Sequence, residues 1–110
     1  MDIKQALAAF AALSQQTRLE VFRRLIKAGE EGISAGELGE QLDVRQNTMS
    51  ANLAVLLNAG LVRNERYGRS IRYFADFEAL RGLLSFLMED CCGGSTEKCQ
   101  PLIEELVCAC

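Results

Sequence analysis

The sequence contains no histidine among its 110 residues, and this absence excludes two large classes of functional site. Without an imidazole, the chain cannot use histidine as a general acid or base, and it cannot build a zinc site that requires a histidine ligand. The sequence also lacks an apolar run of about 18 residues, the length that a membrane span needs, and an N-terminal segment in which basic residues precede an apolar stretch. It therefore predicts a cytoplasmic protein without a signal peptide or a membrane partner.

The cysteine motifs of redox and phosphatase-like enzymes are missing as well. No two cysteines have the Cys-x-x-Cys spacing of a dithiol oxidoreductase. A phosphatase-like reductase needs an arginine six positions after its cysteine, whereas Glu97 and Lys98 stand six positions after Cys91 and Cys92. No glycine-rich phosphate-binding loop occurs either. The sequence thus predicts a protein that is not an enzyme and that uses no organic cofactor.

The chain has no overall excess of basic residues, but its charge is unevenly distributed. The net charge of −3 divides into −2 over residues 1–44, +4 over residues 45–73 and −5 over residues 74–110. The central segment holds five arginines and one glutamate. A basic segment between acidic flanks can bind phosphate groups while the flanks oppose non-specific binding. The alternative interpretation is an ordinary solvated basic loop.

Residues 34–62 contain two short helical patterns separated by a break of about three residues. Ser34 and Glu37 predict a capping box at the start of the first helix, and Gly60 is suited to end the second. The second pattern has an apolar stripe, formed by Met49, Leu53, Leu56 and Leu57. Its opposite face is small, polar and uncharged. Such a pair of helices is typical of a helix-turn-helix that reads the DNA major groove, and a plain helical hairpin is the alternative.

Helices are also expected on either side of this pair. Residues 2–13 have one apolar side, and Ser14 is expected to cap the helix that follows, with Arg18 on its outer side. An apolar stripe from Leu80 to Met88 predicts a last long helix.

Residues 61–75 predict a β-hairpin with its turn at residues 67–70. Arginine recurs at every third position of the hairpin, and these side chains are expected to contact the DNA backbone or the minor groove: Arg63, Arg66, Arg69 and Arg72. All elements together predict an α+β, mainly α, fold. It is a winged helix-turn-helix with a two-stranded β wing.

Several motifs match one known family in residue type and spacing. They lie at residues 13–21, 46–50, 53–56 and 59–62, and in the hairpin at Gly68, Arg69 and Tyr73. In these motifs the chain resembles the ArsR family of bacterial repressors that sense metals and metalloids. The resemblance implies a homodimer joined by the first and last long helices, which represses transcription from palindromic double-stranded operator DNA and is released by an inducer ion. It assigns DNA binding and dimerisation to residues 1–90 and inducer binding to a Cys-rich tail at residues 91–110.

The DNA-binding set that follows combines the second helix of the motif with the hairpin. It consists of Arg45, Gln46, Asn47, Thr48, Ser50, Asn52, Arg63, Arg66, Arg69 and Arg72. Arg45 stands where the family usually has a capping serine, and Ala51 and Asn52 stand where a basic or imidazole-bearing pair is common. The operator sequence therefore cannot be inferred from relatives.

All five cysteines lie in the last twenty residues, and the resemblance assigns three of them to the inducer. The Cys-x-Cys site of one branch would fall at residues 33–37, which contain no cysteine, and the Asp/His site of another needs histidine. A further branch has a Cys-Cys pair and a third cysteine beyond the last helix, as Cys91, Cys92 and Cys99 do here. Three thiolates suit a soft ion, so arsenite or antimonite is the expected inducer.

Other interpretations of these thiols remain open. Cys108 and Cys110 are possible additional ligands, and four of the five cysteines could bind zinc. Cadmium or lead, methylarsenite, or oxidation of the thiols could also be the signal. Buried, inert cysteines are the remaining alternative.

Overall fold

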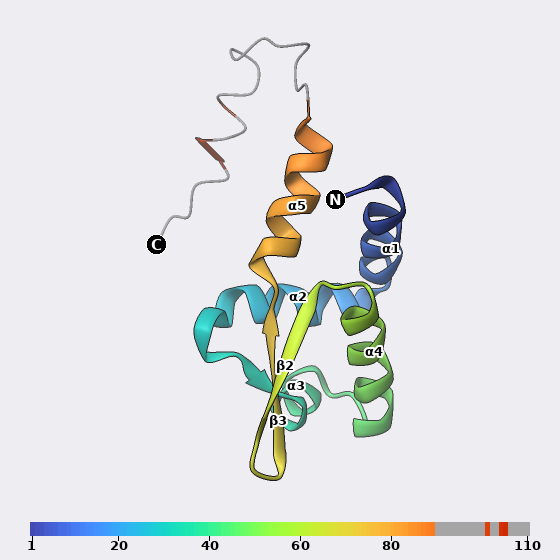
Figure 1. Cartoon of the computed structure of the whole chain (residues 1–110). Coiled ribbons are helices and arrows are strands. Elements are labelled where there is room, and N and C mark those ends of the chain that lie inside the picture. Colours follow the sequence, from blue (N-terminus) through green and yellow to red (C-terminus); the bar gives the residue numbers. More distant parts are fainter. Residues whose placement is uncertain (90–100, 102–103, 106–110) are drawn as a thin grey trace.

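The computed structural model describes residues 1–89, 101 and 104–105 (Figure 1). Over these residues the chain forms helices α1 (Ile3–Leu13), α2 (Gln16–Ala28), α3 (Ala35–Leu42), α4 (Gln46–Asn58) and α5 (Phe77–Met88), a 3₁₀ turn η1 (Gly29–Glu31), and strands β1 (Ile33–Ser34), β2 (Val62–Tyr67) and β3 (Ser70–Ala75). The predicted winged helix-turn-helix is confirmed. No described helix has both the length and the apolar character that crossing a membrane demands. The predicted Cys-rich tail lies almost entirely outside the described residues.

The sheet has one strand more than the predicted two-stranded wing. Its order is β1-β3-β2, all antiparallel, with Ile33 opposite Tyr73 and Val62 opposite Ala75. Strand β1 is only two residues long, too short for alternation of apolar and polar residues to reveal it. By pairing with β3, it attaches the base of the wing to the start of α3.

The helix starts follow local side-chain chemistry, with two differences from expectation. Ser34 begins α3 as predicted, because its Oγ accepts a hydrogen bond of 3.2 Å from the backbone N–H of Glu37. The other half of the predicted capping box does not form, since the Glu37 carboxylate accepts from the Ser34 hydroxyl instead of the Ser34 backbone N–H. Ser14, however, does not cap α2. Its hydroxyl donates to the Ala11 carbonyl at the end of α1, and the side chain of Gln15 accepts from the Arg18 N–H instead. The turn between α1 and α2 is therefore one residue longer than expected.

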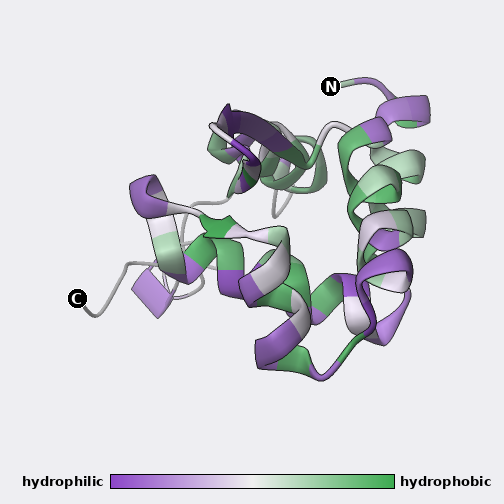
Figure 2. Cartoon of the chain, turned by 90° about the horizontal axis from the view of Figure 1, so that it is seen from below, coloured by the Kyte–Doolittle hydropathy of each residue, from purple (hydrophilic) through white to green (hydrophobic). Residues whose placement is uncertain are grey.

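The core lies where the first four helices meet the sheet. Its largest fully buried side chains are Leu25, Leu38, Met49, Leu53, Leu56, Leu61 and Val21. Three of them belong to the apolar stripe of α4 that the sequence predicts. Figure 2 shows the hydrophobic residues of the helices alternating with hydrophilic ones along each ribbon, as expected for helices with one buried side.

A large apolar surface remains uncovered on α1 and α5, which stand together at the end of the molecule opposite the wing tip (Figure 1). We call it the α1–α5 apolar face. It consists of Ile3, Leu7, Phe10, Leu84 and Leu87, which are 39–62% exposed. Leu83 is the only fully buried residue that α5 contributes. A contiguous apolar surface of this kind usually marks a protein interface.

Gly39 in α3 is needed for the tight approach of α3 to the turn that precedes α4. A Cβ atom at this position would lie 2.9 Å from the Val44 carbonyl oxygen and collide with the side-chain amide of Gln46. Alanine is a better helix former than glycine by about 1 kcal/mol, but overpacking costs about 1–3 kcal/mol. We therefore expect Gly39→Ala to lower the free energy of unfolding in urea.

The matched control is Gly36→Ala in the same helix. A Cβ atom there would meet nothing nearer than the Ser34 hydroxyl at 4.0 Å. This substitution should leave stability unchanged or raise it by up to about 1 kcal/mol. Equal effects of the two substitutions would contradict the proposed role of Gly39.

Candidate nucleic-acid interface

Helices α3 and α4 form the helix-turn-helix, and residues 43–45 form its turn. Asp43 adopts the left-handed conformation (φ 53°), which asparagine and aspartate tolerate better than other side-chain-bearing residues. The Val44 N–H then donates to the Gly39 carbonyl at 2.9 Å and closes the end of α3. The predicted break of about three residues is confirmed, and it brings α4 across α3.

The exposed side of α4 has the chemistry expected of a base-reading surface. Gln46, Asn47, Thr48 and Ser50 are exposed, whereas Met49 is fully buried. The Asn47 Oδ1 accepts the Thr48 N–H at 2.9 Å, and the Gln46 amide donates to the Ala35 carbonyl. The remaining amide and hydroxyl groups are suited to hydrogen bonds with base edges or phosphates.

Arg45 stands at the N-cap of α4 without making a side-chain capping hydrogen bond. A cation at a helix N-terminus opposes the helix dipole, and a serine or aspartate cap would stabilise the helix by about 1 kcal/mol. The exposed guanidinium and the backbone N–H groups of Gln46 and Asn47 are both suited to a phosphate oxygen. We therefore expect Arg45 to favour DNA binding at the expense of helix stability.

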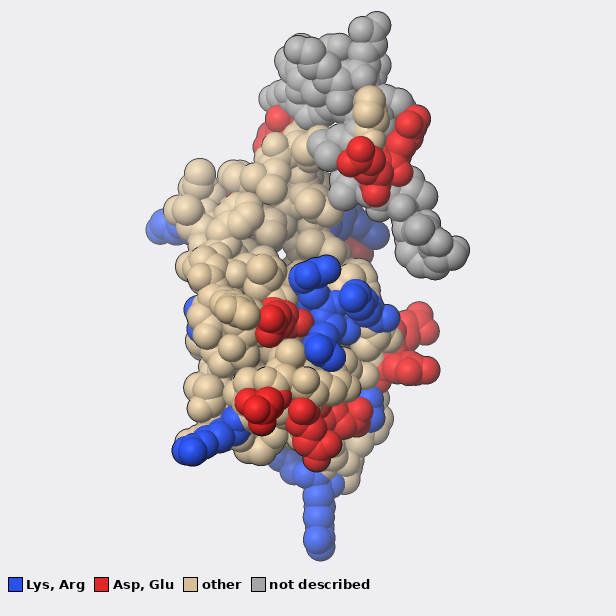
Figure 3. Space-filling model, turned by 180° about the vertical axis from the view of Figure 1, so that it is seen from behind, with Lys and Arg blue, Asp and Glu red and all other residues tan. Residues whose placement is uncertain are grey.

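The wing projects from the body of the molecule, and its turn contains Gly68 in the left-handed region (φ 62°). Arg66 and Arg69 are exposed near this tip, and basic side chains project from the wing end of the molecule in Figure 3. Tyr67, which the sequence analysis did not single out, is 55% exposed beside them. Its hydroxyl donates to the Glu65 carboxylate at 2.7 Å, and this hydrogen bond raises the pKa of Tyr67.

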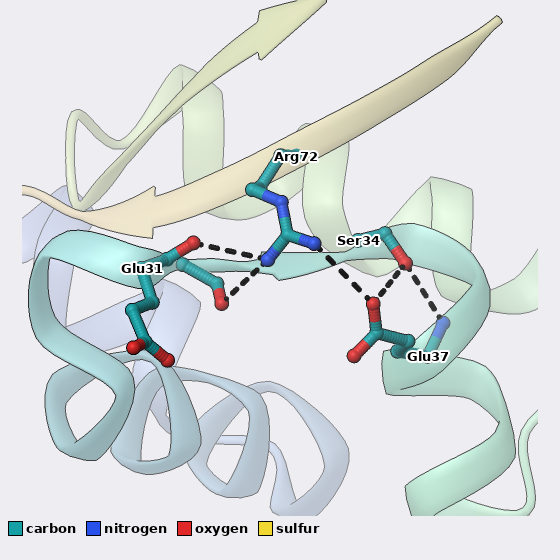
Figure 4. Close-up of polar contacts among 5 residues, drawn as sticks. Glu31, Ser34, Glu37 and Arg72 are labelled. Atoms are coloured by element: carbon teal, nitrogen blue, oxygen red, sulfur yellow. Dashed lines mark hydrogen bonds and ion pairs between the residues drawn. The ribbon is translucent and has the colours of Figure 1, made fainter. Parts of the chain in front are cut away.

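Arg72 has a different role from the one that the sequence predicts. Its guanidinium donates to the backbone carbonyls of Glu31 and Gly32 at 3.0 and 2.9 Å and pairs with the Glu37 carboxylate at 3.5 Å (Figure 4). The side chain is thus directed at the start of α3, where it attaches the wing to the helix-turn-helix. We expect these contacts to hold Arg72 away from a DNA phosphate.

Arg63 is likewise occupied at the base of the wing. Its guanidinium pairs with Glu65 at 3.0 Å and lies 4.4 Å from the centre of the Phe74 ring. The Glu65 partner lies two residues away on the same strand, whereas Phe74 and the partners of Arg72 come from other elements, which the spacing of three residues could not reveal. Of the four wing arginines, Arg66 and Arg69 are exposed near the tip without a side-chain partner among the contacts of the described residues, so we expect them to be the main wing contacts to DNA.

Asn52 does not lie on the exposed side of α4, contrary to expectation. Only 8% of this residue is exposed, and its Oδ1 accepts a hydrogen bond of 3.2 Å from Arg18. Arg18 in turn is not on the outer side of α2, because its Nε donates to the Ala12 carbonyl at 2.7 Å. Helix α2 crosses behind α4 at this point, so a position at the edge of the apolar stripe becomes interior.

A second basic group lies on α2, away from the wing. Arg23, Arg24 and Lys27 line a shallow depression with Glu20. Figure 3 shows acidic side chains between the basic group at mid-height and the wing end of the molecule. The group is therefore not continuous with the surface formed by α4 and the wing tip.

Two substitutions should separate backbone binding from base reading. Arg69→Ala is expected to weaken binding to all DNA sequences by a similar factor and to reduce the slope of log affinity against log salt concentration by about one. Asn47→Ala should instead relax the preference at one base pair, by about 1–3 kcal/mol. Fluorescence anisotropy on a panel of duplexes at several salt concentrations measures both effects.

Arg72→Ala is the matched control for the wing. Because it removes the attachment to residues 31 and 32, it should lower the free energy of unfolding by about 1–3 kcal/mol and leave the salt slope nearly unchanged. A slope change for Arg72→Ala and none for Arg69→Ala would mean that the two roles are reversed.

Comparisons with known proteins identify the family of the chain. Residues 13–65 match a family model described as a helix-turn-helix domain. The chain is 34% identical over 95 residues to an uncharacterized HTH-type transcriptional regulator, YbzH, of Bacillus subtilis, covering 76% of this chain and 95% of that protein. It is 36% identical over 83 residues to the arsenical resistance operon repressor of the same bacterium, covering 76% of this chain and 75% of that protein.

The solved structure of an ArsR-like transcriptional regulator from Rhodococcus sp. RHA1 superposes on the chain with a TM-score of 0.70. The two share 28% sequence identity, and the match covers 97% of this chain and 96% of that one. The similarity thus extends over the helices outside the helix-turn-helix.

Proposed function

The chain belongs to the ArsR family of transcriptional regulators, and on this premise we propose that it is a homodimeric repressor of an arsenic-resistance operon. Trivalent arsenic or antimony, bound by Cys91, Cys92 and Cys99, releases it from its operator. The family and fold are those of DNA-binding regulators, which act by binding rather than by catalysis.

The cysteine set supports this choice of inducer. The chain contains neither histidine nor a cysteine before position 91, so thiolates from the last twenty residues are its means of binding a soft ion. No group of three or more potential metal ligands occurs within the part of the chain that the structure describes. Sulfur ligands favour thiophilic ions over hard ones. The similarity to an arsenical resistance operon repressor favours arsenic over the other thiophilic ions.

The α1–α5 apolar face supports the homodimer. It is contributed by the first and last long helices, and a two-fold axis would bring the same face of a second copy against it. The two α4 helices would then lie in successive major grooves, about 34 Å apart. Because induction needs only a change in this spacing, an inducer bound next to α5 can act without contacting DNA.

The test is a DNA-release titration in which arsenite, antimonite, cadmium, zinc and peroxide are compared in parallel. Release by arsenite and antimonite at the lowest concentrations is expected. Release mainly by cadmium or zinc would favour a sensor of another thiophilic ion, and release only by peroxide, with loss of free thiols, would favour a redox switch through the same cysteines.

The pH dependence adds a second criterion. Cadmium displaces protons from thiols, so release by cadmium should weaken as the pH falls. Arsenous acid exchanges its hydroxide groups for thiolates, and the thiol protons leave as water. Release by arsenite should therefore change much less between pH 6 and 8, a range over which arsenous acid remains uncharged.

A further inference from the structure

Behind the base-reading side of α4, one polar contact connects three helices. The Arg18 side chain on α2 donates through Nε to the Ala12 carbonyl of α1 and through Nη1 to the Asn52 Oδ1 of α4. Asn52 is the single buried polar residue among the described residues, and no fully buried side-chain nitrogen or oxygen atom of these residues lacks a hydrogen-bond partner. The contact is therefore a part-buried polar connection at the edge of an otherwise apolar core.

We propose that Arg18 and Asn52 are positioning residues that fix the rotation of α4 about its own axis relative to α1, and that they thereby set DNA sequence selectivity. This inference rests on the proposed function only in that α4 must read bases. It is independent of the identity of the inducer.

Stability alone does not account for an asparagine at this position. Met49, Leu53 and Leu56 form the rest of the buried stripe of α4, and all three are completely buried. An amide buried among such side chains costs free energy unless it is hydrogen-bonded, and even then its net contribution is small. A leucine would bury more apolar surface. The polar pair instead adds a directional contact that apolar packing lacks.

The directional contact matters because rotation of α4 displaces its base-reading side chains. Apolar contacts are non-directional and permit small rotations, whereas a hydrogen bond weakens within a few tenths of an ångström. With a helix radius of about 5–6 Å including side chains, a rotation of about 20° displaces the outer atoms by about 2 Å. A shift of this size is enough to misalign hydrogen bonds with base edges.

The other half of the contact connects α4 to the helix that carries part of the α1–α5 apolar face. Ala12 lies in the last turn of α1, where carbonyls have no partner within the helix, so Arg18 satisfies an acceptor that would otherwise be free. Beside Arg18, α1 and α4 are separated by an open gap of about 410 Å³. On the α1 side the gap is lined by the small side chains of Ala8 and Ala11, and on the α4 side by Val55 and Asn58. Apolar packing across such a gap is non-directional, so the Arg18 guanidinium supplies the directional link between the two helices.

The experiment uses the full chain and an operator duplex selected by the wild-type protein from a random library. Affinity for this duplex and for an unrelated duplex is measured at one salt concentration for Asn52→Leu, Asn52→Asp and Arg18→Met. Arg23→Met on the exposed side of α2 is the matched control, because it removes the same charge without a link to α4. Urea unfolding shows whether each variant is folded, and sedimentation gives its oligomeric state.

We expect Asn52→Leu and Arg18→Met to bind the selected duplex roughly 10-fold more weakly than the wild-type protein, because misaligning one base contact costs about 1–3 kcal/mol. Their affinity for the unrelated duplex should change no more than that of Arg23→Met. Asn52→Asp, which keeps an acceptor for Arg18, should retain wild-type selectivity. If Arg18→Met is too unstable to measure, Asn52→Leu alone tests the proposal. We expect this variant to fold, because leucine can pack with the other apolar side chains of the buried stripe of α4.

Wild-type selectivity in a folded Asn52→Leu protein would overturn the proposal. Loss of selectivity in Asn52→Leu with full selectivity in Arg18→Met would also overturn it, because the amide would then read DNA directly. A wild-type protein that selects no sequence would refute base reading by α4 itself, whereas the first two results would leave DNA binding intact.

Discussion

Replacing Leu84 with glutamate is expected to give a monomer that binds operator DNA about 10²–10⁴-fold more weakly than the wild-type protein. Leu84 is 39% exposed on α5, within the α1–α5 apolar face. In a two-fold interface, one substitution introduces two carboxylates, each taken out of water without a partner. A monomer binds one half-site at a time, so it loses the gain in effective concentration that linking two recognition helices provides.

Sedimentation equilibrium and operator titration at the same protein concentration measure this effect. Leu84→Met is the control, since it keeps the apolar surface and nearly the same volume and should preserve both the dimer and tight binding. A Leu84→Glu protein that stays dimeric would show that the interface lies elsewhere. A monomer with undiminished operator affinity would contradict the two-half-site arrangement.

The elements of the helix-turn-helix could be predicted from the sequence because their signals are local. The Ser34 hydroxyl and the Glu37 N–H are three residues apart, and the stripe from Met49 to Leu57 repeats within one helix. The hairpin is similarly marked by strand-forming residues around a turn. In each case the residues that determine the structure are neighbours in the chain.

The role of single polar side chains could not be predicted, because their partners are distant in sequence. Arg72 binds backbone carbonyls about 40 residues earlier, and Arg18 reaches an asparagine 34 residues later. The spacing of residues along the chain shows which of them share one face of a strand or helix, but not what that face contacts. Whether that face meets solvent, DNA or another helix is decided by packing. The sequence therefore predicted the exposed side of α4 and the wing tip, but not the intramolecular partners of Arg18, Arg63 and Arg72.

The relation between α5 and the cysteines bears on how induction works. Helix α5 ends at Met88, and Cys91 follows three residues later in the sequence. The proposed DNA-binding residues, 45–50 and 66–69, include no cysteine and lie more than 20 positions earlier in the chain. We therefore expect the inducer to act on DNA binding indirectly, through the arrangement of α1 and α5.

Replacing any one of Cys91, Cys92 or Cys99 with serine is expected to give a protein that binds its operator normally but is no longer released by arsenite. Serine nearly preserves the size of the side chain, but its hydroxyl oxygen is a hard ligand and a poor one for a thiophilic ion. We expect operator binding by the apo protein to be unaffected, since none of these cysteines belongs to the proposed DNA-binding set. Operator anisotropy during an arsenite titration measures the release, and the Cys108→Ser/Cys110→Ser double variant, which should still respond, is the control.

The size of the effect follows from linkage. Allosteric coupling is usually about 1–3 kcal/mol, so arsenite should lower the operator affinity of the wild-type protein by about 5–150-fold, and the operator should weaken arsenite binding by the same factor. In the serine variants both factors should fall to one. Normal release of the Cys99→Ser protein at the wild-type arsenite concentration would remove Cys99 from the site. The vicinal pair Cys91 and Cys92 would then be sufficient, and a pair of thiolates suits a methylated arsenical, which has only two positions to exchange, better than arsenite itself.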